Sequence, residues 1–132
     1  MKSAKCIFVM GGPGSGKGSQ CAKMVERYGY AHISSGDLLR EEVASGSRRG
    51  RKLGEMMGRG GLVPDSVVLE MVKEAMVAIG EQARGFLIDG YPRTLAQCRE
   101  FESSVVPCHK VCSCLMRWHV FFFLFDHFFF FF

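Results

Sequence analysis

The chain has 132 residues, the size of one ordinary domain, with a formal net charge of +4 and 48% apolar residues. It is too apolar and too weakly charged for a disordered chain, and its 16 glycines follow no collagen period. The composition is uneven, because all the glycines lie in residues 1–90 whereas nine of the 12 phenylalanines lie in residues 121–132. The charge balance does not require a nucleic-acid partner.

We expect neither a membrane span nor an export signal. The apolar tail at 120–132 has 13 residues and contains Asp126 and His127, whereas a spanning helix needs about 20 apolar residues. The apolar run at 6–10 is shorter than the core of a signal peptide, and a glycine-rich loop follows it. A cytoplasmic location with reduced cysteines is therefore expected.

Three short runs predict strands, and the first of them is expected to be buried because it is continuously apolar rather than alternating. These strands are residues 5–10, 30–33 and 86–89, and residues 107–111 are able to open a fourth. Helical segments separate the strands, so an α/β fold with a parallel sheet and right-handed crossovers is expected. Ligands bind at the carboxyl ends of such strands, which directs attention to the loops after Met10, Ile33 and Asp89.

Helix signals fill the first two crossovers. Gly29 ends a predicted helix over 19–28, and the residues expected to face its core are Ala22, Met24 and Val25. Ser35 or Asp37 is expected to cap a helix over 38–44. The basic, glycine-broken segment at 47–61 predicts one short helix with loops.

Two further helices are predicted. Pro64-Asp65-Ser66 is a helix start signal, and apolar residues recur behind it at helical spacing up to Gly80. The predicted core positions are Val68, Met71, Val72, Ala75, Met76 and Ile79. Thr94 and Gln97 have the spacing of a capping box for a helix over 94–101.

The loop at residues 11–19 has the phosphate-loop spacing G-x-x-x-x-G-K, with Gly11, Gly16 and Lys17 in place. Glycines let successive backbone N–H groups point at phosphate oxygens, and the following helix adds its N-terminal dipole. The loop lies between a predicted strand and a predicted helix, as this mechanism requires. Gly18 stands where the general motif has Ser or Thr, and the hydroxyl comes one residue later at Ser19.

Four segments in order resemble the adenylate kinase family of nucleoside monophosphate kinases, and its short cytosolic type most closely. They are the phosphate loop at 11–20, the acceptor segment at 28–40, Gly-Leu-Val-Pro-Asp at 61–65 and Gly-Phe-Leu-Ile-Asp-Gly-Tyr-Pro-Arg at 85–93. The resemblance implies a P-loop NTPase-like three-layer sandwich with a parallel sheet. It also implies reversible phosphoryl transfer, ATP + AMP ⇌ 2 ADP, by a monomer.

The resemblance assigns the donor side of the site. The residues that would hold the ATP phosphates are Gly14, Ser15, Gly16, Lys17, Gly18 and Ser19. Asp89 would organise the Mg²⁺ bound with ATP, through water, because Mg²⁺ keeps much of its hydration. The alternative for Asp89 is a turn residue at the end of a strand. Lys17, Asp89 and Arg93 are thus the expected catalytic residues.

The resemblance also assigns the acceptor side. Arg40 and Arg93 would grip the AMP phosphate, because guanidinium forks suit it, although Arg40 on its own equally fits a solvated helix face. The remaining acceptor residues would be Ser35, Leu62, Val63, Gly90 and Gln97. Gln97 would either hydrogen-bond the adenine or act as the capping partner of Thr94.

Two nearby features receive plainer interpretations. The basic run at 48–52 has no interleaved aromatic residues and is expected to be a solvated face rather than a nucleic-acid site. His32 is expected to be structural.

Ser35 and Tyr91 favour adenylate kinases, because the related UMP/CMP kinases usually have Ala and Phe at these positions.

The expected division is a kinase core at 1–106, containing a monophosphate-binding insert at 34–63, and a tail at 107–132 without a family counterpart. A complete family member continues with further strands, a lid and several arginines, whereas here only Arg117 follows. We therefore expect weak nucleotide binding and impaired transfer.

The tail has several possible readings. A zinc cluster of its cysteines and histidines has the wrong spacing for paired C-x₂-C ligands, and a lipid anchor lacks a basic flank. The phenylalanine run reads as a translated pyrimidine tract from an aberrant transcript. The alternatives to an adenylate kinase are a UMP/CMP kinase, a non-catalytic nucleotide-binding fragment and a gene-model artefact.

Overall fold

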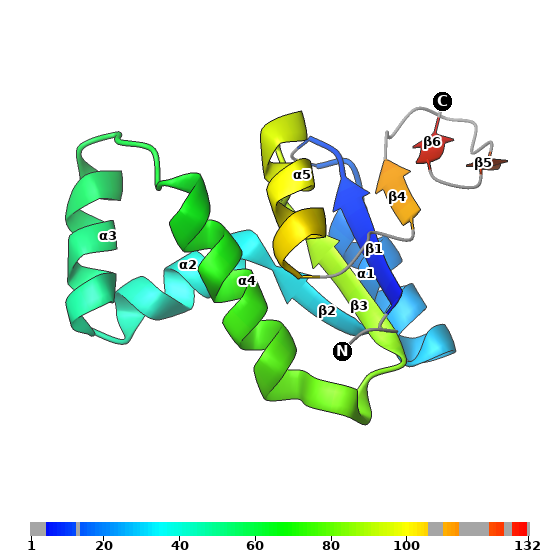
Figure 1. The fold of residues 1–132 in the computed structure, drawn as a ribbon, viewed down its shortest axis with the longest axis horizontal. Helices are drawn as coiled ribbons and strands as arrows, with labels where there is room; N and C mark the ends of the chain where they lie inside the picture. Colours follow the sequence, from blue (N-terminus) through cyan, green and yellow to red (C-terminus); the bar gives the residue numbers. More distant parts are fainter. Residues whose placement is uncertain (1–4, 13, 106–109, 114–121, 126–127, 132) are drawn as a thin grey trace.

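The computed structural model describes residues 5–12, 14–105, 110–113, 122–125 and 128–131, with side chains described within the first two ranges. Its strands form one six-stranded sheet in the order β2-β3-β1-β4-β6-β5 (Figure 1). The strand bounds are β1 Lys5–Met10, β2 Ala31–Ser34, β3 Gly85–Asp89, β4 Lys110–Ser113, β5 Phe122–Phe125 and β6 Phe128–Phe131.

The sheet is parallel from β2 through β3 and β1 to β4, which confirms the expected α/β class. β1 lies between β3 and β4, so the loop that follows β1 emerges from the interior of the sheet. β4 pairs with β1 from Ile7↔Lys110 to Met10↔Ser113, slightly later in the chain than the fourth strand predicted at 107–111. β6 is parallel to β4 and antiparallel to β5.

Helices cover both faces of the sheet. α4 and α5 lie in front of it in Figure 1 and α1 lies behind, while α2 and α3 project to the left as an arm. The helix bounds are α1 Lys17–Tyr28, α2 Ser35–Ala44, α3 Arg48–Gly58, α4 Asp65–Ile79 and α5 Leu95–Ser104, with a 3₁₀ turn η1 at Gly80–Gln82.

Alternate residues of the strands build two separate hydrophobic layers, because successive side chains point to opposite faces of a sheet. The layer on the α4 and α5 side contains Cys6, Phe8, Ile33, Leu69, Val72, Met76, Phe86, Ile88, Tyr91 and Phe101. The layer on the α1 side contains Ile7, Val9, Cys21 and Leu87, with Met24 and Tyr30 packed against it. Burial on both faces explains why β1 and β3 read as continuous apolar runs.

Two helix predictions were wrong in detail. Ser34 caps α2 by accepting a hydrogen bond from the backbone N–H of Asp37 at 3.3 Å, so Ser35 is the first helical residue and is buried. The chain turns directly from β2 into α2, which leaves Asp37 in the first turn rather than at the cap.

The buried face of α1 also differs from the prediction. Cys21 is buried and Met24 is half-buried, whereas Ala22 and Val25 are exposed. Positions 21 and 24 share a face because residues three apart on a helix lie side by side. The cysteine, rather than the alanine or valine, supplies the apolar contact with β1 and β3.

The apolar stripe predicted on α4 is confirmed. Met71, Val72 and Met76 are buried, and Leu69, which the spacing argument missed, is buried beside them. The remaining predicted positions, Val68, Ala75 and Ile79, pack against this layer. In the part of the chain that the model describes, no helix combines the length and apolarity needed to cross a membrane.

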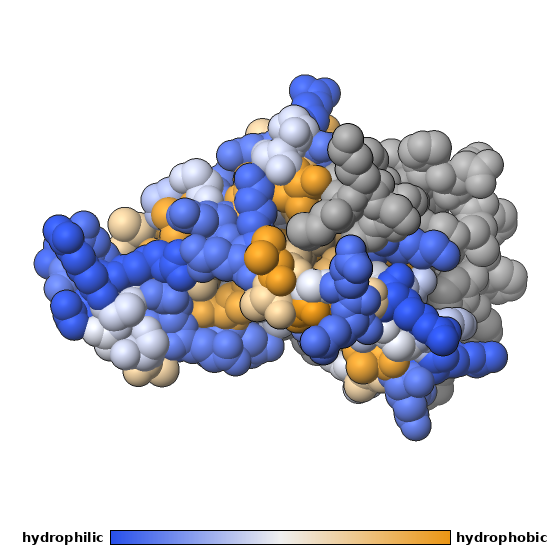
Figure 2. All heavy atoms as spheres, turned by 60° about the horizontal axis from the view of Figure 1, so that its bottom comes forward, coloured by the Kyte–Doolittle hydropathy of each residue, from blue (hydrophilic) through white to orange (hydrophobic). Residues whose placement is uncertain are grey.

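The arm formed by α2 and α3 is closely packed near the turn that joins the two helices. A Cβ built on Gly50 would lie 2.0 Å from the carbonyl oxygen of Glu42, so only glycine permits this approach of α3 to α2. The surface of the arm is mainly hydrophilic in Figure 2, whereas hydrophobic side chains gather nearer the middle of the molecule.

Candidate active site

The loop between β1 and α1 turns at glycines that take positive φ values. Gly14 and Gly16 have φ values of +73° and +81°, a left-handed conformation that favours glycine. Gly16 precedes α1, and no side chain caps the first turn of that helix. The first turn, which contains Gly18 and Ser19, is exposed. This geometry suits an anion at the helix N-terminus.

Lys17 lies over the same loop. Its Nζ atom donates hydrogen bonds to the carbonyl oxygens of Gly11 at 2.8 Å and Gly12 at 3.0 Å. The ammonium group is therefore held against the loop that precedes α1, where a bound phosphate would need a positive charge.

Three buried polar atoms stand out in this region. Among the described side chains, the buried oxygen and nitrogen atoms without a hydrogen-bond partner are Ser15 Oγ, Ser35 Oγ and Asp89 Oδ1. They come from the phosphate loop, the start of α2 and the end of β3, the three positions that follow parallel strands. An unpartnered buried polar group costs about 1–3 kcal/mol, so such groups together indicate a binding site.

Asp89 lies at the carboxyl end of β3 with its side chain 14% exposed. Its Oδ2 atom is 3.6 Å from Nε2 of His32, a contact that sequence reasoning did not predict. A partly buried carboxylate oxygen beside a phosphate loop fits Mg²⁺, because Mg²⁺ prefers oxygen ligands and is usually held by one or two carboxylates together with phosphates and water.

Gly90 brings the acceptor residue Ser35 next to this edge. A Cβ on Gly90, whose φ is +76°, would lie 2.8 Å from Ser35 Oγ. Tyr91 follows and is buried, and burial raises the pKa of its hydroxyl to about 12. A cis peptide bond joins Tyr91 to Pro92.

Gln97 is fully engaged within the protein. Its Oε1 accepts a hydrogen bond from the backbone N–H of Arg93 at 2.5 Å, and its Nε2 donates to Asp65 Oδ1 at 2.6 Å. Its own N–H donates to Thr94 Oγ1 at 3.2 Å, which forms the Thr94 half of the predicted capping box. Sequence reasoning missed Asp65, because nothing local links residues 65 and 97.

The two predicted phosphate-binding arginines differ in their surroundings. Arg93 is exposed, and its Nε donates to the carbonyl oxygen of Gly90 at 3.1 Å, which keeps it beside the end of β3. Arg40 is exposed on α2 and hydrogen-bonds Asp37. That bond, together with one involving Ser34, lowers the pKa of Asp37.

Leu62 and Val63 are not packed into the core. Leu62 is 89% exposed and Val63 is half-buried. They follow Gly61, whose N–H donates to the carbonyl oxygen of Met56 at 2.9 Å and so closes the end of α3. Packing in the core therefore does not fix the side chains of Leu62 and Val63.

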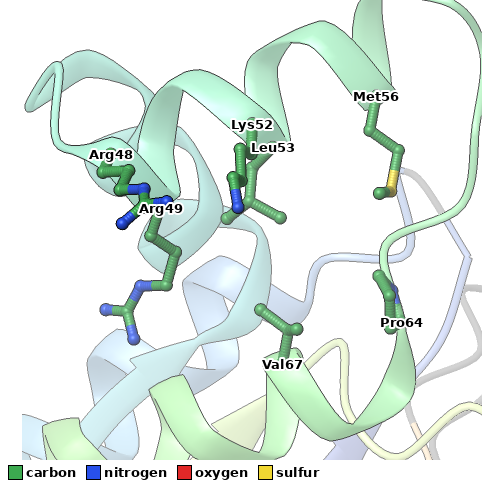
Figure 3. A pocket seen from close by; sticks show the side chains of 7 residues that line it. All are labelled: Arg48, Arg49, Lys52, Leu53, Met56, Pro64 and Val67. Atoms are coloured by element: carbon green, nitrogen blue, oxygen red, sulfur yellow. The ribbon is translucent and has the colours of Figure 1, made fainter.

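A groove of about 610 Å³ separates α3 from the start of α4 (Figure 3). The residues that line it are Arg48, Arg49, Lys52, Leu53, Met56, Pro64 and Val67. The basic run at 48–52 thus forms part of a groove wall. The sequence had predicted only a solvated face for this run. Apolar side chains share the groove with the basic ones, so it offers both a charge and a nonpolar surface.

Arg49 is held by two acidic residues from neighbouring helices. Its Nη2 lies 2.9 Å from Glu42 Oε2 of α2 and 2.8 Å from Glu74 Oε2 of α4. The hydrogen bond from Arg49, assisted by one from Ser47, lowers the pKa of Glu42 to about 2. Arg49 also lowers the pKa of Glu74, and the pKa of Arg49 itself is raised.

Comparison with known proteins gives one family. The family model described as "Adenylate kinase" matches residues 9–121. Adenylate kinase isoenzyme 1 of Oryctolagus cuniculus is 60% identical over 105 residues, and the isoenzyme 1 proteins of Cyprinus carpio and Homo sapiens are each 59% identical over the same length. Each alignment covers 80% of this chain and 54% of the relative, so the chain spans about half the length of the curated relatives it matches.

Proposed function

The chain belongs to the adenylate kinase family, a family of phosphotransferases, and from this premise we propose that it binds ATP and AMP and transfers a phosphoryl group between them. The observation that carries the proposal is the position of Ser15 Oγ, Ser35 Oγ and Asp89 Oδ1. The unpartnered state of these atoms in the loop after β1, at the start of α2 and at the end of β3 supports a site with a donor part and an acceptor part.

On the donor side, the backbone N–H groups of residues 14–19 would bind the phosphates of ATP. Lys17 would neutralise the β- and γ-phosphates. Its hydrogen bonds to the loop carbonyls support this role, because they keep the ammonium group at the loop. Mg²⁺ bound with ATP would supply further neutralisation of phosphate charge. Asp89 would orient the water shell of that ion from the end of β3.

On the acceptor side, Arg93 and Arg40 would bind the phosphate of AMP as guanidinium forks. Ser35 and Gly90 would border the nucleoside, with Leu62 and Val63 from the loop after α3. The engagement of Gln97 with Arg93 and Asp65 supports a positioning role for it, since it fixes the backbone of the residue that would hold the phosphate.

The proposal also includes the domain division, the location, the oligomeric state and the rate expected for this chain. The arm of α2 and α3 would be the monophosphate-binding insert at 34–63 of a core at 1–106, with a distinct tail at 107–132. The protein would be a cytoplasmic monomer. By itself the 132-residue chain would transfer phosphate more slowly than its relatives, because it spans about half their length and Arg117 is its one arginine after residue 99 that could help to stabilise the transferred group.

The test combines binding and turnover on the 132-residue chain. Calorimetric titration with Mg²⁺–ATP, and separately with AMP and UMP, is expected to show binding of ATP and a preference for AMP. A coupled assay of ADP formation is expected to show a rate well below that of a full-length isoenzyme 1. Lack of ATP binding would contradict the proposal, and a rate equal to that of the full-length enzyme would contradict slow transfer.

A matched pair of lysine variants sharpens this test. Lys17→Met is expected to weaken ATP binding by about tenfold or more, because it removes a charged hydrogen bond worth about 1.5–3 kcal/mol. Lys23→Met removes the same charge from an exposed position on the same helix and is expected to leave ATP affinity unchanged. Equal losses in the two variants would indicate general electrostatics rather than a phosphate site.

A further inference from the structure

Cys21, His32 and Asp89 meet at one end of the sheet although they come from three different elements. Cys21 lies on α1, His32 on β2 and Asp89 at the end of β3. The sulfur of Cys21, an imidazole nitrogen of His32 and a carboxylate oxygen of Asp89 all lie within 4.8 Å of one another. His32 Nε2 and Asp89 Oδ2 are 3.6 Å apart.

The strand register explains why these side chains meet. His32 of β2 pairs with Leu87 of β3, and residues 87 and 89 share a face because they are two apart on a strand. Leu87 belongs to the hydrophobic layer that contains Cys21. All three side chains therefore lie on the side of the sheet that α1 covers.

The three groups are chemically suited to a transition metal. Thiolate, imidazole and carboxylate are the ligands of Zn²⁺, whereas Mg²⁺ prefers oxygen alone. With metal–ligand bonds of about 2.0–2.3 Å, ligand atoms of a tetrahedral zinc lie about 3.3–3.6 Å apart. The His32–Asp89 distance already matches this value, and the sulfur of Cys21, which lies within 4.8 Å of both other ligand atoms, needs a shift of at most about 1.2 Å to match it.

Burial gives the cluster a closed side and an open side. Cys21 is fully buried, the side chain of Asp89 is 14% exposed and that of His32 is 31% exposed. The second oxygen of Asp89 is buried without a hydrogen-bond partner. An ion entering from the His32 side would meet all three ligands and keep one position for water, which is the usual pattern of an open zinc site.

We infer that Cys21, His32 and Asp89 form a binding site for one Zn²⁺ ion. On binding, the Cys21 thiol releases its proton to the solvent and the sulfur bonds the metal as a thiolate. The site does not depend on the proposed phosphoryl transfer. It would nevertheless oppose that reaction, because a direct zinc–carboxylate bond removes Asp89 from the water shell of the nucleotide-bound Mg²⁺.

The test measures Zn²⁺ binding directly, without nucleotide, so that its failure is separate from failure of the proposed function. The metal-free 132-residue chain, kept reduced by a phosphine, is titrated with Zn²⁺ against a chromophoric zinc indicator. Millimolar Mg²⁺ is expected not to displace the zinc. Co²⁺ is expected to give the thiolate charge-transfer absorption that only a sulfur ligand produces.

Variants assign the ligands. Cys21→Ser and His32→Gln are each expected to weaken zinc binding by at least about tenfold, the lower end of the effect of altering even an indirect zinc partner. Cys98→Ser is the matched control, because Cys98 lies on α5 and packs against the opposite hydrophobic layer. A triple change of Cys108, Cys112 and Cys114 to Ser controls for tail cysteines, whose side chains lie outside the described residues.

The outcomes separate cleanly. The inference is supported if the control variants keep the zinc affinity of the unaltered chain and the two ligand variants lose it. It is overturned if zinc does not bind, or if binding follows the tail cysteines and not Cys21 and His32. Should Cys21→Ser fail to fold by circular dichroism, His32→Gln, at a partly exposed position, and the Co²⁺ spectrum of the tail variant still decide the question.

Discussion

Gln97 and Asp65 stand 32 positions apart in the sequence, yet Gln97 Nε2 donates a 2.6 Å hydrogen bond to Asp65 Oδ1. The bond joins the first turn of α5 to the first residue of α4. Through its Oε1 atom, the same side chain holds the backbone N–H of Arg93. One amide therefore fixes the positions of two helix starts and of the loop between β3 and α5.

This relationship predicts the behaviour of a pair of substitutions. Gln97→Glu keeps the acceptor for Arg93 but sets a carboxylate against Asp65, so we expect a loss of about 1–3 kcal/mol in the free energy of unfolding. Adding Asp65→Asn restores a donor opposite the new carboxylate and is expected to recover most of that loss. Urea unfolding of the two single variants and the double variant measures the coupling. Additive effects would show that the bond contributes little.

Gly90 predicts a local effect on the acceptor side. Gly90→Ala places a methyl group 2.8 Å from Ser35 Oγ in addition to the strain of a φ of +76°. Gly60→Ala is the matched control, because Gly60 has a φ of +73° and nothing within 4 Å of the added carbon. We expect about 1–2 kcal/mol for the control from strain alone and a larger loss for Gly90→Ala. Thermal unfolding measures both, and equal losses would contradict the contact with Ser35.

The close approach of α3 to α2 at Gly50 predicts that a larger residue there destabilises the arm. Gly50→Ala forces the added carbon against the Glu42 carbonyl oxygen, 2.0 Å away, so α2 and α3 must separate. We expect a loss of about 1–3 kcal/mol or more, the range of overpacking in a tight interior. Gly58→Ala, in the last position of the same helix with nothing within 4 Å, is expected to be neutral or stabilising by up to about 1 kcal/mol. Calorimetry of the two variants provides the comparison.

The acid dependence of stability follows from Arg49. The pKa of Glu42 falls from 4.5 to about 2 in the folded chain, so between these pH values the unfolded chain binds more protons than the folded one. This contribution is therefore present above pH 4.5 and is lost as the pH falls toward 2. In Arg49→Gln the stabilisation from the lowered pKa of Glu42 is expected to be missing at neutral pH. The difference in the free energy of unfolding between this variant and the unaltered chain should therefore shrink as the pH falls from 4.5 to 2.

The control for that experiment is Arg48→Gln, an exposed neighbour with the same charge. It is expected to show no stability difference that disappears between pH 4.5 and pH 2. Urea unfolding at several pH values, repeated at high salt, measures both variants. A constant difference for Arg49→Gln across this range would mean that the Glu42 carboxylate gains nothing from its neighbour.

The sequence predicted best where one local rule decides the structure. Lys5–Met10 is a strand because a continuous apolar run fits a strand buried on both faces, and the α4 stripe is buried because its spacing is helical. The turns of the loop at 11–19 were predicted because they need positive φ values, which glycine adopts more readily than other residues.

Prediction was weaker where distant residues decide the structure. Cys21, not Val25, faces the sheet, and the spacing of apolar residues alone does not reveal which side of α1 packs against β1 and β3. The partners of Gln97 and of Asp89 lie on other elements, so neither Asp65 nor His32 carries a local signal. For the same reason the two charged partners of Arg49 were not predicted.

The single guanidinium that joins Glu42 to Glu74 also has a mechanical meaning. It binds the region of the α2–α3 turn to α4 by hydrogen bonds to carboxylates on two different helices. The arm cannot pivot about the β2–α2 junction unless α4 follows or these bonds break. Arg49 therefore ties the arm to α4, and any rotation of the arm against α4 would have to break its two hydrogen bonds to Glu74.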